Sequence, residues 1–147
     1  MEVALVTKAL SAVIGKQILT KAITDSSFGI YSTLSSIYFY SNDVKSILEE
    51  LDINQKIKAL ECLCKSLTNL EDKTGVITLC LESIHDMILE IKADLKIIHA
   101  KIAKHKKKYF NNWRSVNIKK YVKNLKKHCD ILDKRYLFLV NSIKMLN

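Results

Sequence analysis

Apolar residues recur three and four positions apart along almost the whole chain, a spacing that places them on one face of an α-helix. The pattern divides most of the chain into four segments, residues 27–51, 53–67, 74–110 and 118–146. No proline interrupts these segments, and only three glycines occur in 147 residues. No stretch alternates apolar and polar residues for long enough to be a buried strand. The sequence therefore predicts an all-α fold.

Short polar segments separate the predicted helices. They predict turns near residues 24–26, 52, 69–74 and 111–115. Ser26 or Ser27 is suited to cap the helix that follows, and Asp52 with Gln55 resembles a capping box. Because short turns force neighbouring helices to pack antiparallel, the predicted fold is an up-and-down bundle of four or five helices with a long final helical hairpin. We expect residues 1–147 to form a single helical-bundle domain.

Residues 3–23 are apolar apart from scattered polar residues and Lys8, Lys16 and Lys21. A secretory signal would have a basic start, an uninterrupted apolar middle and a small-residue cleavage site, and that order is absent. The lysines also disfavour a membrane-spanning helix. Two interpretations remain open: the segment is the central helix of a bundle, or it is a helix that leaves the bundle and enters a membrane surface.

Positive charge is concentrated late in the chain. Residues 95–129 contain twelve Lys and Arg residues and no Asp or Glu, in a chain of formal net charge +9. A dense field of one sign attracts a polyanion, either nucleic acid or an anionic membrane, and in the predicted hairpin it occupies the tip and both arms. The candidate anionic-surface binding residues are Lys101, Lys104, Lys106, Lys107, Lys108, Trp113, Arg114, Lys119, Lys120, Lys123, Lys126 and Lys127.

The identity of the basic residues narrows the kind of recognition. Lysine accounts for 22 of the 24 basic residues, and the two others are Arg114 and Arg135. Arginine is favoured for bidentate reading of a guanine edge or a phosphate, whereas lysine acts as a mobile point charge. We therefore expect non-specific attraction to phosphate. Trp113, in the predicted turn, suits both a lipid headgroup boundary and stacking on unpaired bases.

No catalytic or cofactor motif emerges, so we expect a non-enzymatic protein without a cofactor. The sequence has no glycine-rich phosphate loop, no GxSxG and no HExxH. Glu82, Asp86 and Glu90 share a helical face with His85, but a di-iron site in a bundle requires a second Glu-x-x-His motif. We interpret the three acids as a solvated face of the fourth segment.

The cysteines predict reduced thiols and an intracellular protein, cytoplasmic or membrane-associated. Cys62 and Cys64 are two positions apart and therefore point to different helix faces. His99, His128 and Cys129 would supply three zinc ligands if the last two helices brought them together, but their spacing matches no known zinc finger, and we expect no metal site. The richness in Lys, Ile and Asn suggests an AT-rich genome, such as that of some large DNA viruses or a protist.

The opening segment VALVTKALSAVIGKQILTKAI, followed by long amphipathic helices and a lysine cluster, resembles the membrane-permeabilising four-helix domains of cell-death proteins. These are the executioner bundle of the mixed-lineage kinase-like pseudokinase, the fungal HeLo domains and the related plant resistance-protein domains. The resemblance implies that lysines recruit the bundle to anionic lipids and that oligomerisation or release of a helix perturbs the bilayer. It covers most of the chain but involves no residue-by-residue motif, so no functional residue is carried over.

Three function classes follow from these observations. The first is a non-enzymatic bundle that binds an anionic membrane surface through the 95–129 tip and perturbs the membrane through its first helix. The second is a non-specific nucleic-acid-binding or virion-packaged basic protein of a large DNA virus. The third is a scaffold or virion component whose charge serves assembly and solubility. The expected partner is an anionic membrane or nucleic acid, with self-association, and no small-molecule substrate is expected.

Overall fold

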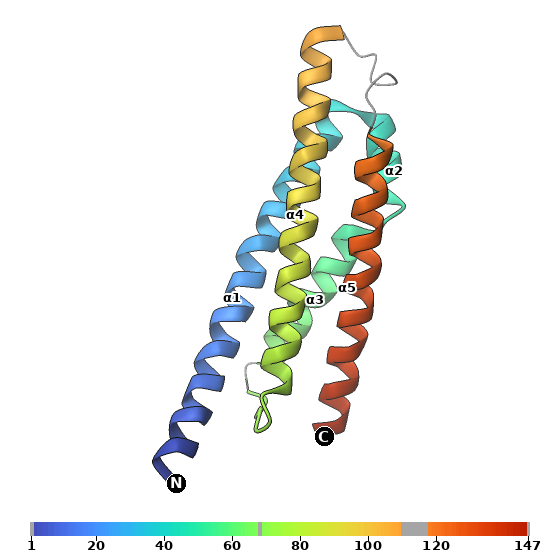
Figure 1. The fold of residues 1–147 in the computed structure, drawn as a ribbon. Coiled ribbons are helices and arrows are strands. Elements are labelled where there is room, and N and C mark those ends of the chain that lie inside the picture. Colours follow the sequence, from blue (N-terminus) through green and yellow to red (C-terminus); the bar gives the residue numbers. More distant parts are fainter. Residues whose placement is uncertain (1, 68, 110–117, 147) are drawn as a thin grey trace.

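The computed structural model describes the backbone of residues 2–67, 69–109 and 118–146, and the side chains of residues 15–67, 69–105 and 118–146. Five α-helices occupy these segments (Figure 1). Their bounds are α1 Glu2–Tyr40, α2 Asn42–Glu49, α3 Ile53–Ser66, α4 Val76–Tyr109 and α5 Lys119–Leu146. The described segments contain no strand. The predicted all-α bundle with a long final hairpin is confirmed.

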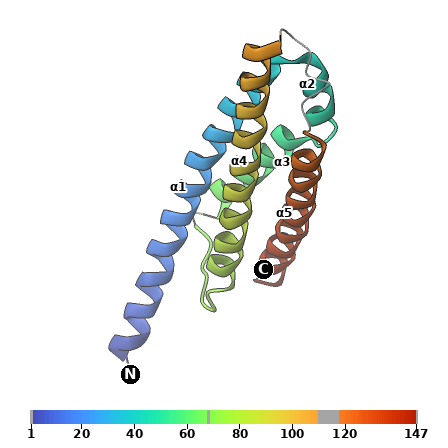
Figure 2. The same cartoon turned by 45° about the horizontal axis from the view of Figure 1, so that its top comes forward.

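The helices alternate in direction along the chain (Figure 1). α1 runs along the length of the molecule, α2 and α3 return, α4 runs forward again and α5 returns. α4 is central to the packing, because it makes its most extensive contacts with α1 on one side and with α5 on the other. Figure 2 shows α3 behind and between α4 and α5, with α2 beyond the upper end of α5. The neighbours α4 and α5 are therefore antiparallel, whereas the neighbours α1 and α4 are parallel.

Two glycines of α1 lie against α4. A Cβ atom on Gly15 would lie 3.6 Å from Cγ2 of Thr78, and a Cβ atom on Gly29 would lie 2.8 Å from Cε of Lys92. In both pairs the α4 residue follows the α1 residue by 63 positions. Such a constant offset arises only when two helices run in the same direction. The register of α1 on α4 is thus maintained over about four helical turns.

The core follows the three-four spacing of the sequence. Buried residues from all five helices form one hydrophobic cluster. Within α4, every apolar position of the pattern from Ile77 to Ile102 is at most 3% exposed. Among the described residues of the pattern, Leu146 at the end of the last helix is the one that is exposed, at 40%. The periodicity therefore identified the buried face of each helix but not how far along α5 that face is covered.

The turn predicted near residues 24–26 is wrong, because α1 is a single helix from Glu2 to Tyr40. Ser27 does not cap a helix. Its buried hydroxyl donates a hydrogen bond of 2.7 Å to the carbonyl of Ile23 inside α1. Ser26 is also buried. A serine hydroxyl in a helix can donate its hydrogen bond to a carbonyl of the preceding turn, so the helix need not end there. Ser26 and Ser27 therefore do not mark a helix boundary.

The helix predicted over residues 27–51 is interrupted at Ser41. Ser41 is the N-cap of α2, with extended backbone, and its hydroxyl accepts a hydrogen bond from the Val44 amide. The turn predicted at Asp52 is confirmed, since this residue has a φ of 54° in the left-handed region. The predicted capping box is wrong, because the Asp52 side chain makes no capping hydrogen bond at the start of α3.

The connection between α3 and α4 matches the turn predicted at 69–74. The Asp72 carboxylate caps α4, accepting hydrogen bonds from the Ile77 and Thr78 amides at 3.2 and 2.9 Å and from the Thr78 hydroxyl at 2.9 Å. Gly75 has a φ of 76° and permits the chain to enter the helix. Lys16 of α1 is only 4% exposed and donates to the Leu70 carbonyl at 2.5 Å, which ties α1 to this connection.

The turn predicted at 111–115 lies outside the described residues, although α4 ends at Tyr109 and α5 begins at Lys119 as that turn requires. For the first helix, the described side chains favour the interpretation as a core helix. Ile23 is completely buried and Lys16 nearly so, whereas Ile18 is 61% exposed. No helix in the described part of the chain is long and apolar enough to cross a membrane.

Candidate anionic-surface binding site

The structure places the described part of the basic block along the α4–α5 hairpin. Lys104 on α4 and the five predicted lysines of α5 are exposed. Lys101 is half-buried, and its Nζ lies 4.9 Å from the centroid of the Tyr121 ring, a cation–π contact between α4 and α5. The side chains of Lys106, Lys107, Lys108, Trp113 and Arg114 lie outside the described residues, so their predicted roles stay predictions.

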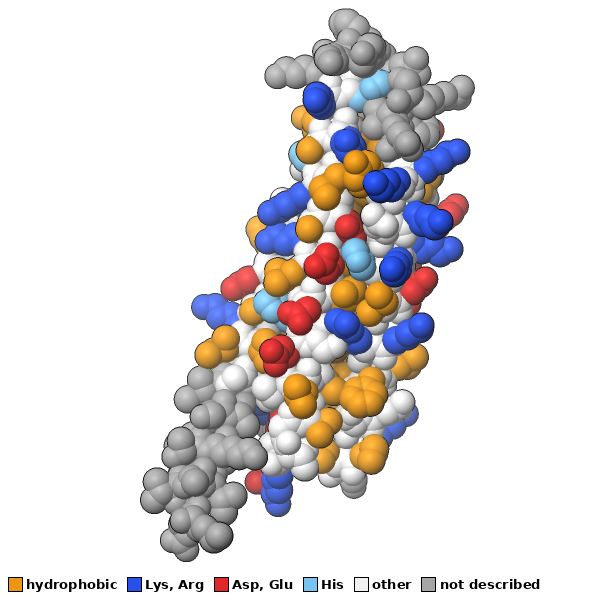
Figure 3. Space-filling model, in the orientation of Figure 1, with side chains coloured by type: hydrophobic (Ala, Val, Ile, Leu, Met, Phe, Trp, Pro, Cys, Tyr) orange, Lys and Arg blue, Asp and Glu red, His pale blue; other side chains and the backbone are white. Residues whose placement is uncertain are grey.

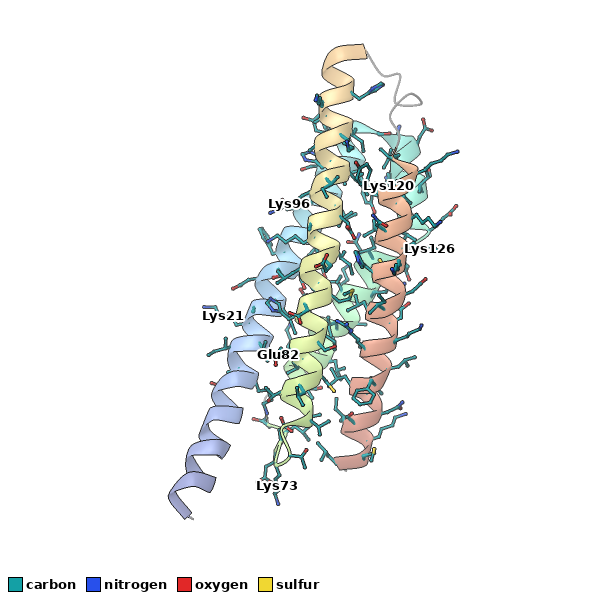
Figure 4. All side chains as sticks on the ribbon, viewed as in Figure 1. Lys21, Lys73, Glu82, Lys96, Lys120 and Lys126 are labelled. Atoms are coloured by element: carbon teal, nitrogen blue, oxygen red, sulfur yellow. The ribbon has the colours of Figure 1, made fainter. Side chains whose placement is uncertain are left out.

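The exposed lysines of α5 lie on one side of that helix. They are Lys119, Lys120, Lys123, Lys126 and Lys127. At 100° per residue these positions fall within roughly a third of the helix circumference, over about 12 Å of its length. Leu125 and Cys129, on the other side of α5, are buried in the core. In Figure 4, Lys120 and Lys126 lie along α5, whereas Lys96 lies on the opposite side of the hairpin.

The same side of α5 changes from cationic to apolar along its length. We call this side the outer face of α5. Its exposed residues are Lys119, Lys120, Lys123, Lys126, Lys127, Asp130, Lys134, Leu137, Phe138, Asn141, Lys144 and Met145. Leu137, Phe138 and Met145 are 59%, 63% and 86% exposed. Figure 3 shows lysines beside the upper half of α5 and hydrophobic side chains gathered over the lower parts of α4 and α5.

Sequence reasoning missed this apolar continuation. Leu137, Phe138 and Met145 follow the acid-free block and were not counted with it. The available signal was helical spacing, because Leu137 falls 18 residues, or about five turns, after Lys119 and thus on the same side of the helix. The charge count alone predicted binding at the tip of the hairpin. The described lysines and apolar residues instead form a face along the length of α5.

The end of the molecule that carries the lysines also carries acids from α2. Asp43 and Glu49 of this short helix and Glu50, its C-cap, are exposed, and α2 lies at the end of the bundle where α5 begins (Figure 1). Lys45 pairs with Glu49 within α2 at 3.8 Å. The acid-free block in the sequence is therefore not an acid-free end of the bundle. These carboxylates lower the positive electrostatic potential near α2. The outer face of α5 is therefore the more uniformly cationic surface.

Polar side chains that follow the lysines along α5 attach this helix to α4 and α3. His128 Nδ1 contacts the Asp94 carboxylate of α4 at 2.5 Å, with both side chains largely buried. Arg135 donates to the Ser83 carbonyl of α4 at 2.6 Å. On the other side of α5, Asp133 pairs with Lys56 of α3 at 3.0 Å. These bonds fix the rotation of α5 and therefore the direction of its outer face.

His99, His128 and Cys129 are not gathered into a metal site. His128 is engaged by Asp94, and the His99 ring lies 5.7 Å from the Tyr40 ring of α1. Cys129 is 1% exposed, and burial raises the pKa of its thiol to about 12. Among the described side chains, no group of three or more His, Cys, Asp or Glu residues is placed to hold a metal ion.

The remaining predicted side chains behave as expected. Glu82, Asp86 and Glu90 are exposed on α4, so their interpretation as a solvated face is confirmed; Figure 4 labels Glu82. The cysteines are free, with Cys62 exposed and Cys64 buried, as their two-residue spacing predicted. Burial raises the pKa of the Cys64 thiol to about 11.

The fold and surface define a class: an all-helical bundle with one cationic and apolar helix face. No protein-family model matches the chain, and no solved structure matches it. The chain is similar to "Uncharacterized protein L717" of Acanthamoeba polyphaga mimivirus, with 33% identity in an alignment of length 150; the match covers 83% of this chain and 73% of the relative. The chain belongs to the same family as this mimivirus protein. A viral relative agrees with one of the two sources that the composition suggested, a large DNA virus or a protist.

Proposed function

We propose that this protein is a non-enzymatic helical bundle that binds an anionic membrane surface through the outer face of α5. The observation that carries the proposal is the succession of five exposed lysines and three exposed apolar residues on one side of one helix. Lysines near an anionic surface contribute about 1 kcal/mol each, and apolar side chains gain by entering the headgroup boundary. A helix that lies flat on a membrane uses both contributions at once.

The apolar half of the face favours a membrane over nucleic acid. Phosphate backbones attract lysine, but they offer no apolar environment to Leu137, Phe138 and Met145. The near-absence of arginine disfavours sequence-specific recognition of nucleic acid, because bidentate base contacts rely on arginine. Non-specific nucleic-acid binding is the alternative that the tests below distinguish.

Perturbation of the membrane by α1 forms the second step of the proposal. Docking through α5 needs no rearrangement, whereas release of α1 must break the hydrogen bond from Lys16 to the Leu70 carbonyl and expose Ile23, Ile30 and Leu34. Burial of such a side chain stabilises the fold by about 1.5–3 kcal/mol. Release of α1 therefore requires that its contacts with the membrane contribute a comparable free energy. We expect docking of α5 and perturbation by α1 to be separable steps.

The first test is a titration of the protein against three partners at low and physiological salt. The partners are phosphatidylcholine liposomes that contain phosphatidylserine, liposomes of phosphatidylcholine alone, and random-sequence duplex DNA. We expect binding to the anionic liposomes that weakens with salt but persists, because the apolar residues still insert. Binding to DNA with a steep salt dependence, at roughly −0.9 in log affinity per phosphate contact, and none to liposomes would establish the alternative.

The second test separates the apolar part of the face from its charge. Leu137→Ser with Met145→Ser leaves every lysine in place, and we expect it to weaken binding to anionic liposomes about tenfold while DNA binding stays unchanged. The matched control is Leu89→Ser with Ile97→Ser, two exposed apolar residues of α4 at 44% and 42% exposure. Equal losses in the two variants, or no loss in the first, would refute the role of the apolar half.

The third test holds α1 in place. A Cβ atom at Gly15 would lie 3.6 Å from Cγ2 of Thr78, so Gly15→Cys with Thr78→Cys places two thiols on facing positions of α1 and α4 for oxidation to a disulfide. Cys62→Ser removes the exposed native thiol from this variant. We expect the oxidised protein to bind anionic liposomes but to release no entrapped dye, and reduction of the same sample to restore release. Dye release by the oxidised protein would exclude α1 as the perturbing element.

A further inference from the structure

A groove lies between the amino-terminal turns of α4 and the second half of α5. Its volume is about 560 Å³, within the range of about 300–1,000 Å³ typical of small-molecule sites. It is lined by Val76, Leu79, Cys80, Ser83, Ile131, Lys134, Arg135 and Phe138. Leu79 and Phe138, one from each helix, are 66% and 63% exposed. They form apolar walls that lack a covering partner among the described residues.

The two helices contribute to the groove in the same pattern. Each supplies four residues at positions i, i+3, i+4 and i+7, which is one stripe of a helix surface. Because α4 and α5 are antiparallel, the bond from Arg135 to the Ser83 carbonyl fixes which ends meet. Val76 and Leu79 lie toward one end of the groove, Ser83, Lys134 and Arg135 lie toward the other, and Ile131 lies about one turn beyond Arg135. The groove therefore has an apolar end and a cationic end, which Ile131 borders.

The charges at the cationic end are available to a ligand. The lining contains two cations and no acid. Arg135 uses one of its five N–H donors on Ser83, which leaves further donors for an anion. Within the described segments no acid forms an ion pair with Lys134. An apolar slot with a pair of cations at one end is complementary to a molecule with an alkyl chain and a negatively charged headgroup.

We propose that this groove binds a single-chain anionic amphiphile of the fatty-acid class. The alkyl chain lies between Leu79 and Phe138, and the carboxylate lies beside Lys134 and Arg135. This inference goes beyond the membrane proposal and does not rest on it, because a monomeric fatty acid in solution can occupy the groove whether or not the protein docks on a bilayer. A test with monomeric ligand therefore succeeds or fails independently of liposome binding.

The test uses isothermal titration calorimetry with three soluble probes and no membrane. Decanoate carries both the chain and the carboxylate, butanoate carries the same carboxylate on a short chain, and decyltrimethylammonium carries the same chain with the opposite charge. We expect saturable binding of decanoate at one site and weaker binding of the two other probes by about tenfold or more. Absence of decanoate binding, or equal binding of all three probes, would overturn the proposal.

Variants locate the bound chain. Phe138→Asp should weaken decanoate binding at least about tenfold, because it places a carboxylate in the apolar wall. Leu137→Asp is the matched control: this neighbouring residue is 59% exposed but does not line the groove. Leu79→Asp tests the α4 wall with a second exposed residue should the first variant fold poorly. If the control variant loses as much affinity for decanoate as the groove variants do, the alkyl chain does not lie in the groove.

A second pair of variants locates the headgroup. Lys134→Glu should weaken decanoate binding roughly threefold to tenfold, as expected for reversal of an exposed charge beside the ligand. Lys144→Glu makes the same change in net charge on the same helix outside the groove, and we expect less than about a twofold effect from it. Equal effects of the two reversals, or no effect of Lys134→Glu, would refute the assignment of the cationic end.

Two native thiols provide an independent measurement. Cys80 lines the groove, whereas Cys62 is exposed on α3. We expect saturating decanoate to slow alkylation of Cys80 by iodoacetamide, measured by peptide mass mapping, while the rate at Cys62 stays constant. Protection of both thiols alike, or of neither, would place the ligand elsewhere and overturn the proposal.

Discussion

Neutralising the lysines of α5 tests whether one helix face or the overall charge binds membranes. In the test variant, Lys119, Lys123, Lys126 and Lys127 are replaced by Gln, which keeps good helix propensity. These four exposed lysines lie within roughly a third of the helix circumference, so all of them can approach one plane. At about 1 kcal/mol per lysine, the variant should lose about 4 kcal/mol, or roughly a thousandfold in affinity for anionic liposomes.

The control variant has the same change in net charge at other places. It replaces four exposed lysines outside the outer face of α5, Lys21, Lys58, Lys73 and Lys96. We expect it to lose less than about tenfold, because most of these charges are farther from the docked face than a Debye length. Co-sedimentation with anionic liposomes measures both affinities, and thermal unfolding checks that both variants fold. Equal losses would show that net charge governs binding, and unchanged binding in the first variant would exclude the outer face of α5.

Three further predictions concern stability, measured by urea unfolding. Gly15→Ala should stabilise the protein by about 0.5–1 kcal/mol, since its Cβ fits against α4, whereas Gly75→Ala should destabilise it by about 1–2 kcal/mol because φ there is 76°; changes of the same sign would contradict this. Asp72→Ala should destabilise by about 1–2 kcal/mol through loss of the α4 cap, with Asp72→Asn less harmful. Burial raises the pKa of the Cys129 thiol from 9.0 to about 12, so the folded protein holds this proton more tightly than the unfolded chain. The contribution of the thiol to the free energy of unfolding is therefore complete below pH 9.0 and falls above it by up to about 1.4 kcal/mol per pH unit. Cys129→Ala should make the alkaline decline in the free energy of unfolding less steep, and an unchanged slope would refute this prediction.

The fold was predictable from the sequence to the extent that periodicity determines it. The three-four spacing located the buried face of α4 at every position from Ile77 to Ile102. It could not locate the break at Ser41, because a serine in an apolar slot suits both a helix interior and an N-cap. It also wrongly predicted a helix boundary at Ser26 and Ser27. The Ser27 hydroxyl donates its hydrogen bond to a carbonyl inside α1. Periodicity reports which residues face the core, whereas helix ends depend on single hydrogen bonds.

The candidate site was predictable only in part. Counting charges identified the lysines of α5, which are exposed as expected. It could not predict that α2 brings Asp43, Glu49 and Glu50 to the same end, because this depends on how the chain folds back. Nor could it predict the groove between α4 and α5, whose two walls come from residues about 60 positions apart. Surfaces shared by two helices depend on the register between them, and the periodicity of each helix does not give that register.

The start of α5 has a consequence for how stability and binding are related. Lys119 and Lys120 occupy its first two positions, and the first turn contains no acid. The amino-terminal end of a helix carries partial positive charge, so a cation there opposes helix formation by about 0.3–1 kcal/mol. Lys119→Glu should therefore raise the melting temperature while weakening attachment to anionic liposomes. At this helix end, a sequence selected for thermal stability alone would evolve away from the lysines on which membrane attachment depends.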